Sequence, residues 1–126
     1  MYAETDFVLA LAKEKDWLKK NALRIYEKHR EEIWTSTLTL IELLLYSHRE
    51  KIKPEQLLQA AHFFLKIKGA DLTEGDLITA ADLMDKFNAT PFDALHAIQC
   101  RGDTIISSDA IFDKIGLKRI KLEEPE

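Results

Sequence analysis

A chain of 126 residues is long enough for one domain. Its 46% hydrophobic and 32% charged residues indicate a compact soluble domain and exclude a disordered chain. The net charge of −4 excludes a generic basic nucleic-acid coat, and the single cysteine excludes an internal disulfide and a cysteine-rich zinc site. We expect one domain at 1–122 and a short acidic tail at 123–126. No apolar run reaches the roughly 20 residues of a membrane span and no secretory signal is evident, so we expect a cytoplasmic protein.

In the first half of the chain, short apolar runs that favour strands alternate with helical patterns. Asp6 and Asp16 are positioned as N-caps of the first two helices, and Trp17 is expected to face inward from the second. The lysines of that second helix are expected on a solvated face, with contact to a phosphate backbone as the alternative. The expected elements are a strand at 2–5, helices at 7–12 and about 17–30, a strand at 33–36, and helices at 38–46 and 54–66.

The second half repeats this alternation and has clearer helix signals. Thr73 and Thr90 are expected to be N-caps, Pro91 fits a first helical position, and Asn88 suits a C-cap. The expected elements are strands at 69–72, 104–108 and 118–122, and helices at 73–87, 90–100 and 111–115. Strands followed by helices predict an α/β fold with a largely parallel sheet.

Acidic residues gather where these strands pass into helices. Glu4 and Asp6 end the first strand, Asp93 opens a helix, and Asp109 ends the strand at 104–108. Parallel sheets bind ligands at the carboxyl ends of their strands, so we expect these side chains to lie close together. Glu42 interrupts an otherwise apolar helix. A carboxylate there is costly to bury unless it is paired or binds a cation.

A structural role remains open for several of these acids. Asp6 and Asp109 suit N-caps, and Asp93 suits a capping box with Thr90. The segment from Thr73 to Asp76 has the same Thr-x-x-Asp pattern with no chemistry attached to it. The pattern alone therefore leaves both roles open for Asp93.

Carboxylates that converge need a counter-charge to stay ionised. Mg²⁺ or Mn²⁺ prefers such oxygen ligands, and it can polarise a phosphodiester and activate a bound water. The acids therefore favour metal-assisted phosphodiester hydrolysis.

Four segments together resemble the PIN domain family, in particular the toxins of prokaryotic VapBC-type toxin–antitoxin pairs. They contain Glu4, Glu42, Asp93 and Asp109 at the family's acidic positions. The resemblance covers nearly the whole chain, and its segments are Tyr2–Leu11, Thr35–Glu42, Pro91–Ala97 and Ile105–Asp113.

The resemblance implies a three-layer fold with a parallel sheet of four or five short strands flanked by helices. It implies Mg²⁺- or Mn²⁺-dependent endonucleolytic cleavage of RNA, restraint by a cognate antitoxin, and a homodimer. Glu4, Glu42, Asp93 and Asp109 are implied as catalytic residues and metal ligands, with Asp6 as a further ligand beside them. Ser107 is implied as a hydroxyl that steadies a ligand or a bound water.

One residue departs from the family pattern, because Glu4 stands where the first acid is usually aspartate. We expect Glu4 to line the site. Either it reaches the metal through another rotamer, or Asp6 replaces it as ligand, or activity is reduced. His96 is expected to pack or hydrogen-bond within a helix interface, with metal ligation or proton transfer as the alternative. Cys100 is expected to be a buried apolar residue.

Two other functions compete with the ribonuclease interpretation. A PIN-fold module with weak or lost catalysis could bind RNA or protein, and the change at Glu4 motivates this alternative. A phosphohydrolase on another doubly wound sheet would need an aspartate nucleophile after the first strand, which Glu4 fits badly.

Overall fold

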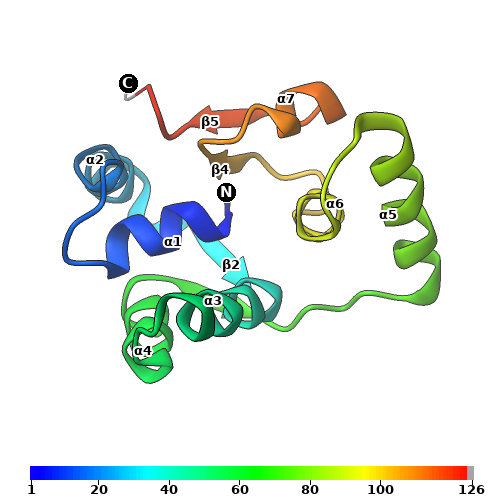
Figure 1. The fold of residues 1–126 in the computed structure, drawn as a ribbon. Helices are drawn as coiled ribbons and strands as arrows, with labels where there is room; N and C mark the ends of the chain where they lie inside the picture. The colour runs from blue at the N-terminus through cyan, green and yellow to red at the C-terminus, as the bar shows by residue number, and fades with distance from the viewer. Residues whose placement is uncertain (125–126) are drawn as a thin grey trace.

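The computed structural model describes residues 1–124 and contains a five-stranded, fully parallel sheet between two layers of helices (Figure 1). The strand order is β3-β2-β1-β4-β5. β1 therefore lies at the centre of the sheet, and α1 (Thr5–Ala12) begins just after its carboxyl end. The strands are β1 (Tyr2–Ala3), β2 (Trp34–Ser36), β3 (Lys66–Lys68), β4 (Ile105–Ser107) and β5 (Arg119–Lys121).

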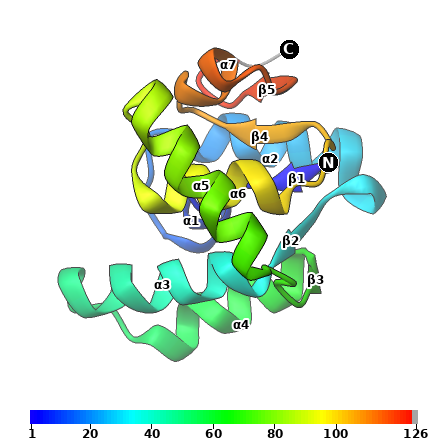
Figure 2. The same cartoon turned by 90° about the vertical axis from the view of Figure 1, so that its right-hand side faces the viewer.

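Helices cover both faces of this sheet. In Figure 1, α1 and α2 lie to the left of the strands, and α6 and α5 to the right; Figure 2 shows α5 and α6 in front of them. The helices are α1 (Thr5–Ala12), α2 (Lys19–His29), α3 (Thr37–Glu50), α4 (Pro54–Phe64), α5 (Glu74–Phe87), α6 (Pro91–Gln99) and α7 (Ile111–Ile115), with a 3₁₀ turn at Arg30–Glu32. This confirms the expected α/β class and three layers.

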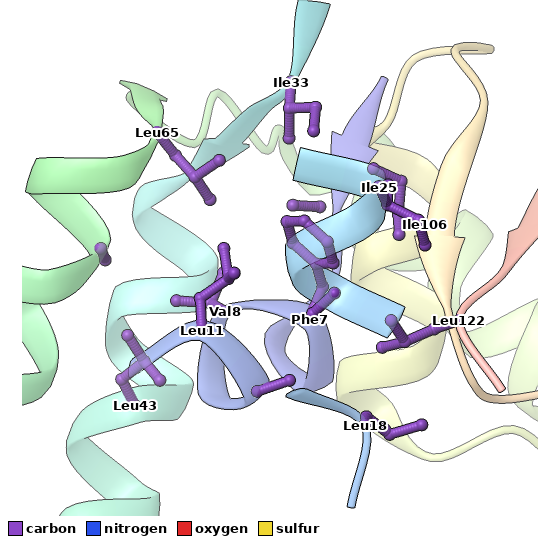
Figure 3. Packing of buried hydrophobic residues seen from close by; sticks show 14 of the residues in the cluster. Phe7, Val8, Leu11, Leu18, Ile25, Ile33, Leu43, Leu65, Ile106 and Leu122 are labelled. Atoms are coloured by element: carbon purple, nitrogen blue, oxygen red, sulfur yellow. The ribbon is translucent and has the colours of Figure 1, made fainter. Parts of the chain in front are cut away.

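The alternation of side chains along the central strands produces two cores. Ala3 and Ile106 contact the larger cluster under α1, α2 and α4, whereas Tyr2 and Ile105 contact the smaller cluster under α6 and α7. Phe7 from α1 lies at the centre of the larger cluster and is fully buried (Figure 3). Successive strand residues point to opposite faces, so two apolar residues in a row serve both layers.

The expected starts of α5 and α6 are confirmed. Thr73 and Thr90 each accept a hydrogen bond from the backbone of the acid three residues later, and that acid accepts one from the threonine's own backbone. Asn88 ends α5 in a left-handed conformation at φ 56°. These capping boxes satisfy backbone donors that the first helical turn leaves unpaired.

Four local expectations are wrong. Asp16 is not the N-cap of α2: Leu18 holds that position, and Asp16 Oδ1 accepts from the Leu18 N–H at 2.9 Å. The third strand is Lys66–Lys68 and not 69–72, because these residues pair with β2 as an exposed edge strand. Trp17 is 78% exposed, since the chain still turns at Asp16 and α2 begins only at Lys19. Asp6 is not an N-cap: Glu4 holds that position, and the Asp6 carboxylate binds elsewhere.

The Lys19 side chain caps the carboxyl end of α1. Its ammonium donates to the carbonyl oxygens of Ala10 (3.3 Å), Leu11 (3.0 Å) and Lys13 (2.6 Å). A cation there satisfies unpaired carbonyls and complements the helix dipole. We expect Lys19→Met to lower the free energy of unfolding by about 1–2 kcal/mol in urea denaturation.

The neighbouring Lys20 provides the control for this prediction, because it is exposed on the same helix. Lys20→Met is expected to change stability by less than about 0.5 kcal/mol. Equal stability of the two variants would contradict the capping role of Lys19.

The expected boundary at 122 stays a prediction. Glu123, in the expected tail, accepts from Arg119 at 2.8 Å, and residues 125 and 126 of that tail lie outside the described residues. Within residues 1–124, no helix combines the length and apolar character needed to span a membrane.

Candidate active site

A pocket of about 330 Å³ lies between the amino end of α1 and helix α3. The pocket is lined by the acids Glu4, Asp6 and Glu42 and by Thr5. Glu4 directly follows β1, so the pocket opens at the carboxyl edge of the parallel sheet, where ligands of such sheets bind. The structure thus brings together three of the five acids that the sequence singles out.

Glu4 is the most deeply buried of these acids, with 9% of the residue exposed. Its Oε2 lies 3.1 Å from the Ser107 hydroxyl, which can donate to it. Burial, together with the nearby carboxylates of Asp6 and Glu42, raises the pKa of Glu4 well above its ordinary value. The fold therefore favours the protonated form of Glu4 more than water does.

Asp6 has two carboxylate oxygens in different surroundings. Oδ2 accepts from the Ser108 backbone N–H (2.7 Å) and from the Ser108 hydroxyl, and the Ser107 hydroxyl lies 3.4 Å away. Oδ1 is buried and has no hydrogen-bond partner among residues 1–124. A buried oxygen without a donor is costly, so Oδ1 is suited to a ligand that the protein itself does not supply.

Glu42 projects from α3. As in Asp6, one of its carboxylate oxygens accepts hydrogen bonds from the protein. Oε1 accepts from the Thr5 hydroxyl and from Nε2 of His96 at 2.8 Å. Burial acts to raise the pKa of Glu42, but the hydrogen bonds from His96 and Thr5 outweigh it, and this pKa lies below its ordinary value. Glu42 therefore stays ionised more readily than an ordinary glutamate.

His96 lies beneath this carboxylate, 1% exposed. Its Nδ1 is 2.7 Å from the Tyr2 hydroxyl, which is 3.0 Å from the hydroxyl of Ser36. Burial raises the pKa of Tyr2 to about 12. A continuous buried chain of hydrogen bonds thus connects β1, α6 and the end of β2 to the pocket.

The structure holds Asp93 and Asp109 in local hydrogen bonds. Asp93 Oδ2 accepts from the Thr90 backbone N–H (3.1 Å) in the capping box, and Asp109 is exposed and accepts from the Ile111 N–H (2.9 Å). Neither residue lines the described pocket. Their roles as catalytic residues and metal ligands stay predictions.

Two partners of the acids were not identified from the sequence. Thr5 is placed by the first turn of α1, and Ser108 by the end of β4. No local signal identifies these pairs, because Thr5 donates to Glu42 and Ser108 donates to Asp6, and the members of each pair lie far apart in the sequence. The expected burial of Cys100 is confirmed.

The donor set fits a divalent cation. Glu4, Glu42 and His96 each offer one potential ligand atom, and these three atoms lie within 4.8 Å of one another. The raised pKa of Glu4 and the unpartnered Oδ1 of Asp6 both indicate that a positive charge would stabilise the site. Carboxylate oxygens are the ligands that Mg²⁺ and Mn²⁺ prefer.

The rim of the pocket carries a cation and aromatic rings. The guanidinium of Arg49 lies 5.4 Å from the centre of the Tyr46 ring, and Phe92 lines the same pocket from α6. The pocket lining therefore combines acids with a cation and aromatic rings.

The fold and this pocket define a parallel α/β domain with an acidic site at the carboxyl ends of its central strands. The family model for the PIN domain matches residues 1–118. The chain belongs to the PIN domain family.

Solved structures with the same fold extend over the whole domain. They include VapC20 of Mycobacterium tuberculosis, a sarcin–ricin loop cleaving toxin (TM-score 0.76, 17% identity, covering 95% of this chain and 98% of that one). FitAcB of Neisseria gonorrhoeae gives 0.71 and 14%, covering 98% of both chains. DNA-bound VapBC of Salmonella typhimurium gives 0.70 and 16%, covering 96% of both. Comparison with curated proteins gives no match.

Proposed function

We propose that this protein is a Mg²⁺- or Mn²⁺-dependent endoribonuclease and the toxin of a toxin–antitoxin pair. The observation that carries the proposal is the organisation of Asp6 and Glu42. Each has one carboxylate oxygen held by protein donors and the other without a hydrogen-bond partner among residues 1–124, at the acidic pocket of a PIN domain. The RNA-cleaving activity of the fold neighbour VapC20 supports the same substrate class.

In this proposal Glu4, Asp6 and Glu42 would hold the cation. Asp93 and Asp109 would contribute their negative charge from the edge of the site. A cation bound in this site would polarise the phosphodiester and would lower the pKa of an attacking water. The protein fixes the carboxylates beforehand through Thr5, His96 and the backbone of Ser108. Such pre-organisation avoids reorganisation during the reaction.

Arg49 has a separate role in the proposal. Its side chain is exposed, contacts the Tyr46 ring and the Glu50 carboxylate, and lines the same pocket as the acids. We expect its guanidinium to contact a phosphate of the RNA backbone. This places positive charge next to the acids although the chain as a whole is acidic.

The proposal is tested with purified protein and a mixed RNA pool in Mg²⁺, Mn²⁺ or EDTA. Wild type is expected to cleave RNA only with a divalent cation. Asp93→Asn keeps an acceptor for the Thr90 N–H and removes the charge, and we expect cleavage to fall about 10–100-fold. Asp76→Asn is the matched control, because Asp76 occupies the same position in the capping box of α5.

Asp76 also forms an ion pair with Arg101 at 3.0 Å, so its variant disturbs folding at least as much as Asp93→Asn. Full cleavage by Asp76→Asn with reduced cleavage by Asp93→Asn supports an active-site role for Asp93. Cleavage that persists in EDTA contradicts the proposal. Metal binding without cleavage of any RNA supports the alternative of a PIN module with lost catalysis, which the Glu4 position favours.

The proposed partners are RNA, a cognate antitoxin and a second copy of the chain, in the cytoplasm. Large apolar side chains are exposed on α3 and α4: Ile41 (51%), Leu45 (54%), which also lines the pocket, and Phe63 (79%). Such exposure supports a protein partner at these helices. Fold neighbours solved as VapBC and FitAB assemblies support a partner of this kind.

A further inference from the structure

We propose that His96 is a positioning residue, which donates from Nε2 to Oε1 of Glu42 while Tyr2 fixes its other ring nitrogen, so that Oε2 of Glu42 is left to bind the cation. This inference rests on the proposed function. It assigns His96 a role outside the metal's ligand shell.

The first support is the saturation of one Glu42 oxygen. Oε1 already accepts from the Thr5 hydroxyl and from His96 Nε2, whereas Oε2 has no hydrogen-bond partner among residues 1–124. A carboxylate held through one oxygen by donors on α1 and α6 cannot rotate freely about its last torsion. The remaining oxygen is thereby presented in one direction.

The second support is the tautomer that the neighbours impose. An ionised carboxylate only accepts hydrogen bonds, so the short contact to Glu42 requires a proton on Nε2. A phenol keeps its proton at neutral pH, and the Tyr2 hydroxyl can donate to Nδ1 while accepting from Ser36. A ring protonated on Nε2 therefore satisfies these partners.

The third support is the rigidity of the chain that holds the ring. His96, Tyr2 and Ser36 are all at most 1% exposed, and they come from α6 and from the two neighbouring strands β1 and β2. Water therefore does not compete for these hydrogen bonds. Outer partners of this kind fix metal ligands in other sites, and their loss typically costs about 10–100-fold in metal affinity.

Direct ligation by His96 is the competing interpretation, because its ring nitrogen lies among the candidate ligand atoms. A ligating Nε2 would have to lose its proton and give up the 2.8 Å contact with Glu42. Nδ1 would then carry the proton and donate to Tyr2. The two interpretations therefore require opposite tautomers.

Nitrogen-15 NMR of the histidine rings in the wild-type protein, with and without Mg²⁺, distinguishes these tautomers. We expect His96 to be protonated on Nε2 in both conditions. A ring protonated on Nδ1 once Mg²⁺ is bound would overturn the proposal. This measurement needs no variant and does not depend on RNA cleavage.

Mn²⁺ titration calorimetry gives the second readout. We expect His96→Leu to weaken Mn²⁺ binding about 10–100-fold. His96→Gln keeps an N–H donor for Glu42 and is expected to restore most of the affinity. His62→Gln, on the exposed surface of α4, is the control and is expected to bind like wild type.

The outcomes separate the two levels of the hypothesis. If wild type binds no Mn²⁺ and cleaves no RNA, the proposed function fails, whatever the tautomer of His96. If wild type binds Mn²⁺ and His96→Leu, with a retained thermal unfolding transition, binds it equally well, the positioning role is wrong. If His96→Leu does not fold, a His96→Gln variant with the affinity loss expected for His96→Leu contradicts the role of the N–H donor.

Discussion

Glu42→Gln is expected to lower metal-dependent RNA cleavage by about 100-fold or more, because a bound cation supplies several kcal/mol of transition-state stabilisation. Glutamine has nearly the same shape, and its amide oxygen can still accept from Thr5 and His96. The substitution removes the negative charge of the carboxylate, whose Oε2 is proposed to bind the cation. The variant should therefore keep its fold and lose Mn²⁺ affinity together with activity.

Glu74→Gln is the matched control for Glu42→Gln, since Glu74 is exposed in the first turn of α5 and does not line the pocket. Cleavage rates and Mn²⁺ affinity are measured for both variants beside their thermal unfolding. A Glu42→Gln protein that cleaves RNA at the wild-type rate would rule out Glu42 as a ligand. Calorimetry keeps the test decisive even where the RNA target is narrow.

The helices were predictable where local chemistry specifies them. Thr73 and Thr90 indicate helix starts, because the two side chains of a capping box are only three residues apart in the sequence. The third strand was misplaced because Lys66–Lys68 forms an edge whose lysines are exposed, and strand propensity does not identify such a segment. It is a strand because β2 offers it a pairing partner, and that information is not local.

The candidate site was predictable to a similar depth. The convergence of Glu4, Asp6 and Glu42 follows from parallel topology, since the carboxyl ends of neighbouring strands meet. The sequence could not tell which oxygen of each carboxylate is held, because Ser108 donates to Asp6 across 102 positions. The contact between His96 and Tyr2 spans 94 positions and was equally hidden.

The acids differ in how far their surroundings distinguish them. Asp93 and Asp76 have the same capping geometry, so neither pattern nor backbone separates a cap from a ligand. Glu42 is different, because an acid on an apolar helix has no cheap structural explanation. Burial cost therefore argues against a purely structural role for Glu42, whereas the short motif leaves both roles open for Asp93.

Glu4→Gln is expected to stabilise the metal-free protein at neutral pH. Burial and the charges of Asp6 and Glu42 raise the pKa of Glu4 in the fold, so the fold favours the protonated form. The stability from this preference is fully present below the unfolded pKa, near 4.5, and is lost as pH rises through the folded pKa. Glutamine imitates the protonated form at every pH and removes this loss.

Thermal unfolding in EDTA at pH 5 and pH 8 measures this prediction. The excess stability of Glu4→Gln over wild type should be larger at pH 8. Glu42 does not interfere, because its folded pKa is lowered and its contribution is lost only as pH falls below the tested range. Glu14→Gln, at an exposed loop position, should show no such pH-dependent gain.

Added Mg²⁺ should reverse the order of the two proteins. A ligand at 100 times its dissociation constant stabilises the fold by about 2.7 kcal/mol, and only wild type offers the full set of charges that binds it. The acid that destabilises the empty site would then be the one that stabilises the loaded site. A Glu4→Gln protein less stable than wild type at pH 8 in EDTA would mean that the free carboxylate of Glu4 is already stabilised within the fold, and that a cation is not needed to balance it.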